Sequence, residues 1–151
     1  MFGAPGEANG CLAPDTPRHV VVPLGAHDQT MAFSTAAHCA ASLACFRSGD
    51  VDLASTVFQM DARDALACLA KLTYHEETLH ALRTAFRHAV ATDAELCAFL
   101  WTTRDLPLVY ASDSDTLGAV VSADDGTPPK GRNLVGLAWM EVRAALFKKD
   151  G

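Results

Sequence analysis

Two histidines and two glutamates stand together in HEETLH at residues 75–80. Histidines four residues apart on one helix, with a glutamate beside the first, form the zinc site of metalloproteases. His75 and His80 are five apart, so their rings would diverge by about 140° around a helix. The two rings could share a metal only if another element supplied most of the ligands, and we predict neither a metal nor another cofactor. The sequence also has no Gly-rich phosphate loop and no G-x-S-x-G nucleophile elbow.

Five cysteines are the next side chains capable of chemistry. No two of them form the C-x-x-C pair that zinc sites and redox motifs usually show. Four stand among Ala, Leu and Phe, which favours buried packing over reactivity. The odd number favours free thiols, so we expect a cytoplasmic or other reducing intracellular compartment. The cysteines are Cys11, Cys39, Cys45, Cys68 and Cys97.

The composition bounds the class of protein. A chain of 151 residues, half apolar and one fifth charged, is about one ordinary globular domain. Charge or proline interrupts every long apolar stretch before it could span a bilayer, and the N-terminal stretch lacks the basic and apolar regions of a signal peptide. The net charge of -6 argues against a broad phosphate-binding surface. We therefore predict a soluble domain that binds neither membrane nor nucleic acid.

The elements that would position a site are mainly helices. Residues 1–18 hold three prolines and three glycines, so we predict a flexible segment outside the core, followed by one helical domain over 19–151. The β-branched run at 19–24 predicts a short strand, and residues 108–111 look extended. Capping residues predict helices after Ser34 or Thr35, Asp50, Asp61, Thr92 or Asp93, and Asn133.

Helical spacing of apolar residues adds a helix over about 75–90. In the last helix the same spacing places Val135, Trp139, Val142 and Leu146 on one buried face, with Lys148 and Lys149 in the last turn. The predicted fold class is therefore mainly α, a single compact domain of five or six helices with a few short strands.

The second half of the chain carries a family resemblance. Residues 95–115 read ELCAFLWTTRDLPLVYASDSD, and residues 131–143 read GRNLVGLAWMEVR. Together they resemble the NADAR domain, which ends with a leucine-rich helix, a Leu-x-x-T element, a Leu-Val-Glu strand, an Asp before Trp-Gly, and G-x-N-x-L-G-x-x-L-M-x-x-R. Weaker similarity reaches back to TAAHCAASLACF at 35–46, where His38 matches. The other matching residues are Leu108, Val109, Asp115, Gly118, Gly131, Asn133, Gly136, Met140 and Arg143.

The resemblance implies a mainly helical fold and hydrolysis of a C–N glycosidic bond between a ribose phosphate and a base or amide. Family substrates include ADP-ribose conjugates and early riboflavin intermediates. Such a reaction needs a carboxylate to stabilise an oxocarbenium-like sugar or to activate water, and donors that hold ribose and phosphate. The resemblance thus makes Asp115 and His38 the candidate catalytic residues. The candidate ligand-binding residues are Asn133, Asp113 and Tyr110.

Each of these residues also has a structural interpretation. Asp115 could cap a turn, and Asn133 could be an ordinary helix cap. Arg143 could belong to a buried ion pair. His38 could be a core histidine whose ring nitrogens are satisfied by hydrogen bonds.

Several departures fall on the pocket that the resemblance implies. The helical Glu of the family corresponds to Ala37, whose methyl group can neither accept a proton nor offset positive charge on a sugar. A general acid or base contributes about 10² to 10⁴ in rate, so this loss alone predicts at most a weak enzyme. The other departures are a missing Lys near residues 43–45, Tyr110 for the acid of the strand, Leu117 for the Trp of Trp-Gly, and a short acidic connection at 72–78.

We therefore favour a catalytically degenerate NADAR-like domain kept for binding or assembly with protein partners or further copies. It could be a component of a larger particle, a virion included, since relatives occur in large DNA viruses and phages as well as in cells. The alternative is an active N-glycosidase that uses Asp115, with His38 or Asp113 as helper. A third hypothesis is a sensor that binds an ADP-ribose-like ligand without turnover.

Overall fold

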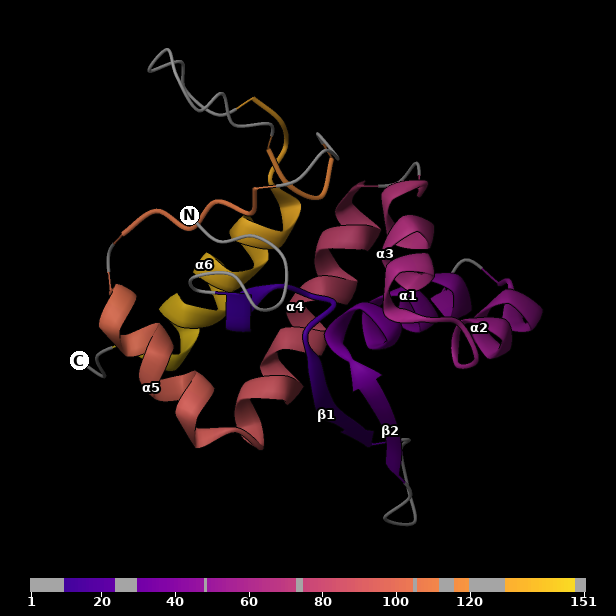
Figure 1. Cartoon of the computed structure of the whole chain (residues 1–151), viewed down its shortest axis with the longest axis horizontal. Coiled ribbons are helices and arrows are strands. Elements are labelled where there is room, and N and C mark those ends of the chain that lie inside the picture. Colours follow the sequence, from indigo (N-terminus) through magenta and orange to yellow (C-terminus); the bar gives the residue numbers. More distant parts are fainter. Residues whose placement is uncertain are drawn as a thin grey trace.

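The computed structural model describes residues 10–23, 30–47, 49–72, 75–104, 106–111, 116–119 and 130–148. Within these ranges the chain forms six α-helices and one two-stranded antiparallel sheet (Figure 1), which confirms the predicted fold class. The elements are η1 (Gly10–Leu12), β1 (Pro17–Pro23), β2 (Thr30–Thr35), α1 (Ala36–Arg47), α2 (Val51–Val57), α3 (Ala62–Ala70), α4 (His75–Ala91), α5 (Ala94–Thr103) and α6 (Leu134–Leu146). None of the described helices has the length and hydropathy that a membrane crossing requires.

Helix α4 is the central element of the fold. It packs against α1 on one side and α6 on the other, while α2 and α3 lie against α1 (Figure 1). Its buried residues recur every three or four positions, as the helical spacing predicts. They are Thr78, Ala81, Leu82, Ala85, Phe86, Ala89 and Val90. The predicted helix over 75–90 is therefore confirmed.

Helix α1 differs from α4 because it is buried on nearly all sides. Only small side chains line most of it, so α2, α3 and α4 can approach its backbone closely. A helix without a polar face is typical of the interior of a fold. The buried residues of α1 are Ala36, Ala37, His38, Cys39, Ala40, Ala41, Ser42, Ala44 and Cys45.

The hairpin of β1 and β2 covers one edge of α1 and α4. Val20 lies opposite Phe33, and Val22 lies opposite Met31. Alternate residues of a strand point to opposite faces, and here Val20, Val22 and Phe33 point inward and are buried. The strand predicted at 19–24 is confirmed, although it begins two residues earlier, at Pro17.

Short polar side chains begin four of the helices, as predicted from their types and positions. Each oxygen accepts a hydrogen bond from an amide of the first turn that has no partner inside the helix. The bonds run from His38 N to Thr35 Oγ1, Leu53 N to Asp50, Asp64 N to Asp61, and Leu96 N to Asp93, at 2.8–3.1 Å.

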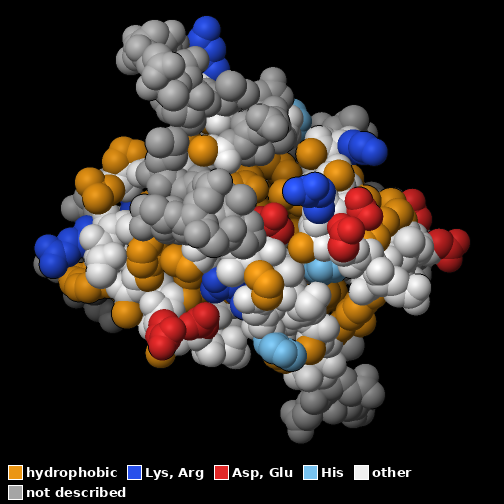
Figure 2. All heavy atoms as spheres, in the orientation of Figure 1, with side chains coloured by type: hydrophobic (Ala, Val, Ile, Leu, Met, Phe, Trp, Pro, Cys, Tyr) orange, Lys and Arg blue, Asp and Glu red, His pale blue; other side chains and the backbone are white. Residues whose placement is uncertain are grey.

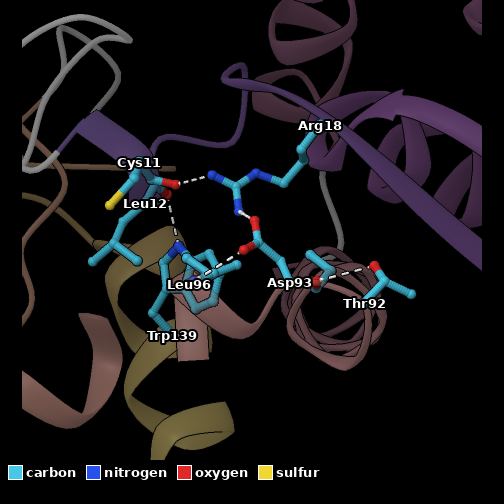
Figure 3. A network of polar contacts seen from close by, with 8 residues as sticks. Cys11, Leu12, Arg18, Thr92, Asp93, Leu96 and Trp139 are labelled. Atoms are coloured by element: carbon cyan, nitrogen blue, oxygen red, sulfur yellow. Dashed lines mark hydrogen bonds and ion pairs between the residues drawn. The ribbon is translucent and has the colours of Figure 1, made fainter. Parts of the chain in front are cut away.

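The prediction that residues 1–18 stay outside the core is wrong for residues 10–18. Leu12 is 1% exposed, and its carbonyl accepts a 2.7 Å hydrogen bond from the Trp139 indole. Arg18 donates to the Cys11 carbonyl and pairs with Asp93 at 3.5 Å (Figure 3). These contacts tie the segment to α6 and to the start of α5. The composition of the segment did not predict this packing, because single residues, Leu12 and Arg18, make the contacts rather than an apolar run.

Two expectations for the C-terminal helix are also wrong. Leu146 is 41% exposed, so only Val135, Trp139 and Val142 of the predicted face are buried. The helix ends at Leu146, and Lys148 lies beyond it rather than in its last turn. Lys149 lies outside the described residues.

Candidate functional site

His38, a predicted catalytic residue, lies in the first turn of α1 and is 4% exposed. Its Nε2 lies 2.8 Å from the Met60 carbonyl oxygen, which can only accept, so Nε2 carries the proton and donates. Nδ1 lies 2.7 Å from the Thr35 hydroxyl oxygen, so this nitrogen also has a hydrogen-bond partner. Both ring nitrogens are therefore occupied, and proton transfer to a ligand would require breaking one of these bonds.

Ala37 precedes His38 and occupies the position of the acid that the resemblance leads us to expect. It is fully buried, and its amide donates a 2.8 Å hydrogen bond to the Pro14 carbonyl. The start of α1 is thus covered by the turn at residues 13–16, in which Thr16 N donates to Ala13 O. A methyl group enclosed in this way provides no chemistry.

Asp15, in the same turn, is a residue that the sequence interpretation missed. Its Oδ1 is buried, and it has no hydrogen-bond partner in the described part of the chain. Burial raises the pKa of this carboxyl, against the opposing effects of its own backbone amide and of Arg63. A carboxyl group with a raised pKa is suited to general acid–base chemistry, so Asp15 joins the candidate site. It was missed because residues 1–18 were assigned to a flexible segment.

The raised pKa of Asp15 gives a testable pH dependence of stability. A folded-state pKa above the unfolded value means that the native state holds the proton more tightly, so Asp15 costs stability as pH rises above about 4. We expect Asp15→Asn to raise Tm at pH 7, with the gain vanishing as pH falls below that value. Thermal unfolding followed by circular dichroism between pH 3 and pH 8 measures this.

The matched control is Asp52→Asn, because Asp52 is an exposed acid in the first turn of α2. Removing its charge should lower Tm slightly, since acids stabilise a helix N-terminus. A lower Tm for Asp15→Asn at pH 7 would mean that attraction to Arg63 outweighs the cost of burial.

Asn133, a predicted ligand-binding residue, bonds to the backbone of the extended segment through both the nitrogen and the oxygen of its carboxamide. Nδ2 donates to the Leu108 carbonyl and Oδ1 accepts from the Tyr110 amide, both at 2.9 Å. Its backbone is left-handed, with φ 53°, and its side chain makes no capping bond to α6. The prediction that Asn133 caps this helix is therefore wrong for its side chain. It joins the extended segment 106–111 to the start of α6 instead.

Gly136 lies where this segment meets α6 most closely. A Cβ at this position would collide with the Leu108 carbonyl and with the Asn133 carboxamide. The Leu108 amide in turn lies 3.5 Å from the Met140 sulfur. Four residues that carry the family resemblance thus form one packing unit, which explains their spacing in physical terms.

The segment at 116–119 lies across the same region. Ala119 N donates to Tyr110 O at 2.8 Å, and Leu117 O accepts from Val135 N at 2.9 Å. Tyr110 is 4% exposed, and Leu117 is 1% exposed. The predicted ligand-binding side chain of Tyr110 is therefore enclosed. Asp113 and Asp115 lie outside the described residues, and their predicted roles stay predictions.

Other side chains capable of chemistry are buried in the core. Burial raises the pKa of the Cys39 thiol to about 12 and also raises that of Cys45. Because the thiolate is the reactive form, both cysteines are poor nucleophiles near neutral pH. Arg143 is 8% exposed and donates to Thr103 Oγ1 at 2.9 Å. Among the described residues there is no cluster of three His, Cys, Asp or Glu suited to a metal ion.

The contacts of the candidate residues form two groups. His38 contacts the loop before α3, whereas Asn133 contacts residues 108–110, and no hydrogen bond between described residues joins these two side chains. Ala37 and Asp15 belong to the first group through the Ala37–Pro14 bond. The structure thus brings an unpredicted acid to the His38 end of α1.

The sequence and the fold were compared with those of known proteins. No protein-family model matches the sequence, and no curated protein matches it significantly. The NMR structure of the E. coli protein YbiA, a NADAR-family protein, is similar to the whole chain, with a TM-score of 0.68 and 18% identity. The similarity covers 100% of this chain and 89% of that of YbiA. The fold is distantly NADAR-like. At this identity the likeness shows the fold alone, and the function must be inferred from the residues.

Proposed function

We propose that this NADAR-like domain is catalytically degenerate and is kept for a binding or structural role. The observation that carries the proposal is the hydrogen bonding of His38, whose two ring nitrogens already have partners inside the protein. A histidine in this state fixes the loop before α3 to α1. It does not present a proton donor or acceptor to a ligand.

Two further positions support the proposal. Ala37 replaces a carboxylate by a buried methyl group, and a carboxylate there would contribute about 10² to 10⁴ in rate. The carboxamide of Asn133 bonds to the backbone of Leu108 and Tyr110 through both its nitrogen and its oxygen, which supports a role in holding the fold. Together these side chains retain the packing that the resemblance predicts and lack its chemistry.

The test is a turnover assay on C–N ribosides. The protein is incubated with NAD, with an ADP-ribosylated substrate and with a riboflavin-pathway ribose phosphate, and released base or amide is separated by liquid chromatography. We expect release at the rate of the buffer control for both wild type and Asp115→Ala. Release by the wild type that Asp115→Ala abolishes would overturn the proposal.

The proposed binding or structural role is tested by measuring ligand binding and the oligomeric state of the protein. Isothermal calorimetry with ADP-ribose distinguishes a ligand-binding sensor from a purely structural domain, because only the sensor gives a saturable heat. Sedimentation velocity then reports whether the chain assembles with itself. A role in a larger particle, a virion included, is part of this proposal and predicts self-association or stable capture by other components of that particle.

Asp15 favours one second candidate, an active N-glycosidase that uses a carboxylate from a new position. Its buried oxygen has no partner in the described structure, and it lies in the turn bonded to Ala37. If the turnover assay is positive, this candidate expects Asp15→Asn to lower kcat at least about 100-fold, as loss of a general acid or base does. Unchanged kcat in Asp15→Asn would exclude Asp15 as the general acid or base and leave Asp115 as the candidate for that role.

A further inference from the structure

A pocket opens along α1, beginning one turn beyond His38. Its volume is about 430 Å³, and ten described residues from β1, β2, α1, α2 and the C-cap of α2 line it. Ser42 and Phe46 line it from the C-terminal half of α1, roughly 6 Å and 12 Å along the helix from His38 at 1.5 Å per residue. In Figure 2 hydrophobic atoms are exposed between the hairpin and α2, at the lower right of the molecule.

The walls of this pocket are aromatic and uncharged. The rings of Phe33 and Phe58 are stacked with their centroids 4.8 Å apart, and Phe46, 64% exposed, stands at the rim. None of the described lining residues carries an ionisable side chain. Polar groups are few, since Ser42 donates to Ala54 O at 3.3 Å and Ser55 is exposed on α2.

The described lining offers no charged partner to the ligands that the family resemblance would suggest. A phosphate or a carboxylate needs a cation or an array of amide donors, and burying either without one is costly. A flat apolar ring instead gains from stacking on phenylalanine and from losing contact with water. The lining therefore selects for an uncharged aromatic molecule and against ADP-ribose.

The size of the pocket fits a small molecule. Ligand sites commonly enclose about 300–1,000 Å³, and the volume of about 430 Å³ lies within that range. A protein partner would also contact residues around the pocket, and the oligomeric state of the variants tests that occupant.

We propose that this pocket is a binding site for a small, uncharged, mainly aromatic molecule. Phe46 and Phe58, which are 64% and 39% exposed, offer rings for stacking, and Ser55, exposed on α2, offers its hydroxyl to a polar substituent at the mouth. Neither His38 nor Asn133 lines this pocket, so the proposal does not depend on whether the domain hydrolyses a glycosidic bond. Turnover of a riboside would leave this proposal unaffected.

The test uses N-phenyl-1-naphthylamine, a neutral aromatic probe whose fluorescence rises in apolar surroundings. We expect saturable binding of one probe per chain. Ser55→Trp, which places a bulky ring at the mouth from an exposed helix position, should weaken binding at least about tenfold, because it takes the place of one buried aromatic group. Thr56→Trp is the matched control, since Thr56 is the exposed neighbour on α2 and does not line the pocket.

The outcomes separate the possible occupants. Weakened binding in Ser55→Trp, with wild-type binding in Thr56→Trp and unchanged far-ultraviolet circular dichroism in both, supports the proposal. Phe58→Ala, which removes one of the two exposed phenylalanine rings of the pocket, should also weaken binding. Absence of saturable binding, or equal binding in all variants, overturns it. A wild-type dimer that Ser55→Trp converts to a monomer also overturns it, because the pocket would then be an interface between copies.

Discussion

Replacing Gly136 with alanine is expected to destabilise the protein by about 3–4 kcal/mol, from overpacking and the loss of the two partly buried hydrogen bonds of the Asn133 carboxamide. Alanine is the better helix former by about 1 kcal/mol, so propensity alone predicts the opposite sign. The collision decides the outcome, since a Cβ would meet the Leu108 carbonyl and the Asn133 carboxamide. Urea unfolding monitored by circular dichroism measures the change in the free energy of unfolding.

Gly49 supplies the control for this substitution. It has φ 88° and open space around it, so Gly49→Ala adds backbone strain of about 1 kcal/mol without a collision. Asn133→Gly keeps the left-handed backbone possible and removes the carboxamide. In that background Gly136→Ala should cost less, which a double-mutant cycle would detect. A stabilised Gly136→Ala would show that residue 108 does not approach α6 as described.

Much of the fold could be predicted because its signals are local. Asp50, Asp61 and Asp93 each bond to an amide three residues ahead, so residue type and position suffice to place a helix start. The stripe of α4 is equally local, since its spacing alone defines the buried face. The same holds for the β-branched run of β1.

The details of the candidate site could not be predicted because they depend on distant partners. His38 bonds to a carbonyl 22 residues away, and Asn133 bonds to one 25 residues away. The residue type and position of Asn133 predicted a helix cap. In the structure its carboxamide instead bonds to the backbone of the extended segment 106–111. Asp15 lay in a stretch whose composition indicated flexibility, so its burial had no sequence signal.

The aromatic pocket could not be predicted from the sequence for a third reason. Phe58 follows the end of α2 and stacks on Phe33 of the hairpin. Its 39% exposure is decided by where the hairpin stands relative to α2, which no local pattern encodes. Asp113 and Asp115 stay predictions from the resemblance.

Trp139 is the second position at which a large effect is expected. The residue is 1% exposed, its ring is stacked on Phe86 at 4.0 Å with an interplanar angle of 8°, and its indole N–H donates to Leu12 O at 2.7 Å. Trp139→Ala removes the largest fully buried side chain and should cost about 4–5 kcal/mol. That is a large part of the stability of an ordinary domain, about 5–15 kcal/mol, so the variant should be partly unfolded at 37 °C.

Trp139→Phe separates packing from the hydrogen bond. It keeps a ring against Phe86 but leaves the buried Leu12 carbonyl without its donor, for a cost of about 1–3 kcal/mol. The loss should be local to residues 10–18, so the amides there should exchange hydrogen faster than those of α4. Uniform exchange in this variant would mean that the Trp139–Leu12 hydrogen bond does not hold the N-terminal segment in place.

Trp101 is the matched control, because it is half exposed and meets Phe147 edge-on at 4.9 Å. Trp101→Phe should change stability by less than about 0.5 kcal/mol, as surface substitutions do. It also leaves Trp139 as the sole tryptophan, whose emission should be blue-shifted and resistant to acrylamide until the protein unfolds. Ready quenching in the folded state would contradict the burial of Trp139 and, with it, the packing of Leu12 against α6.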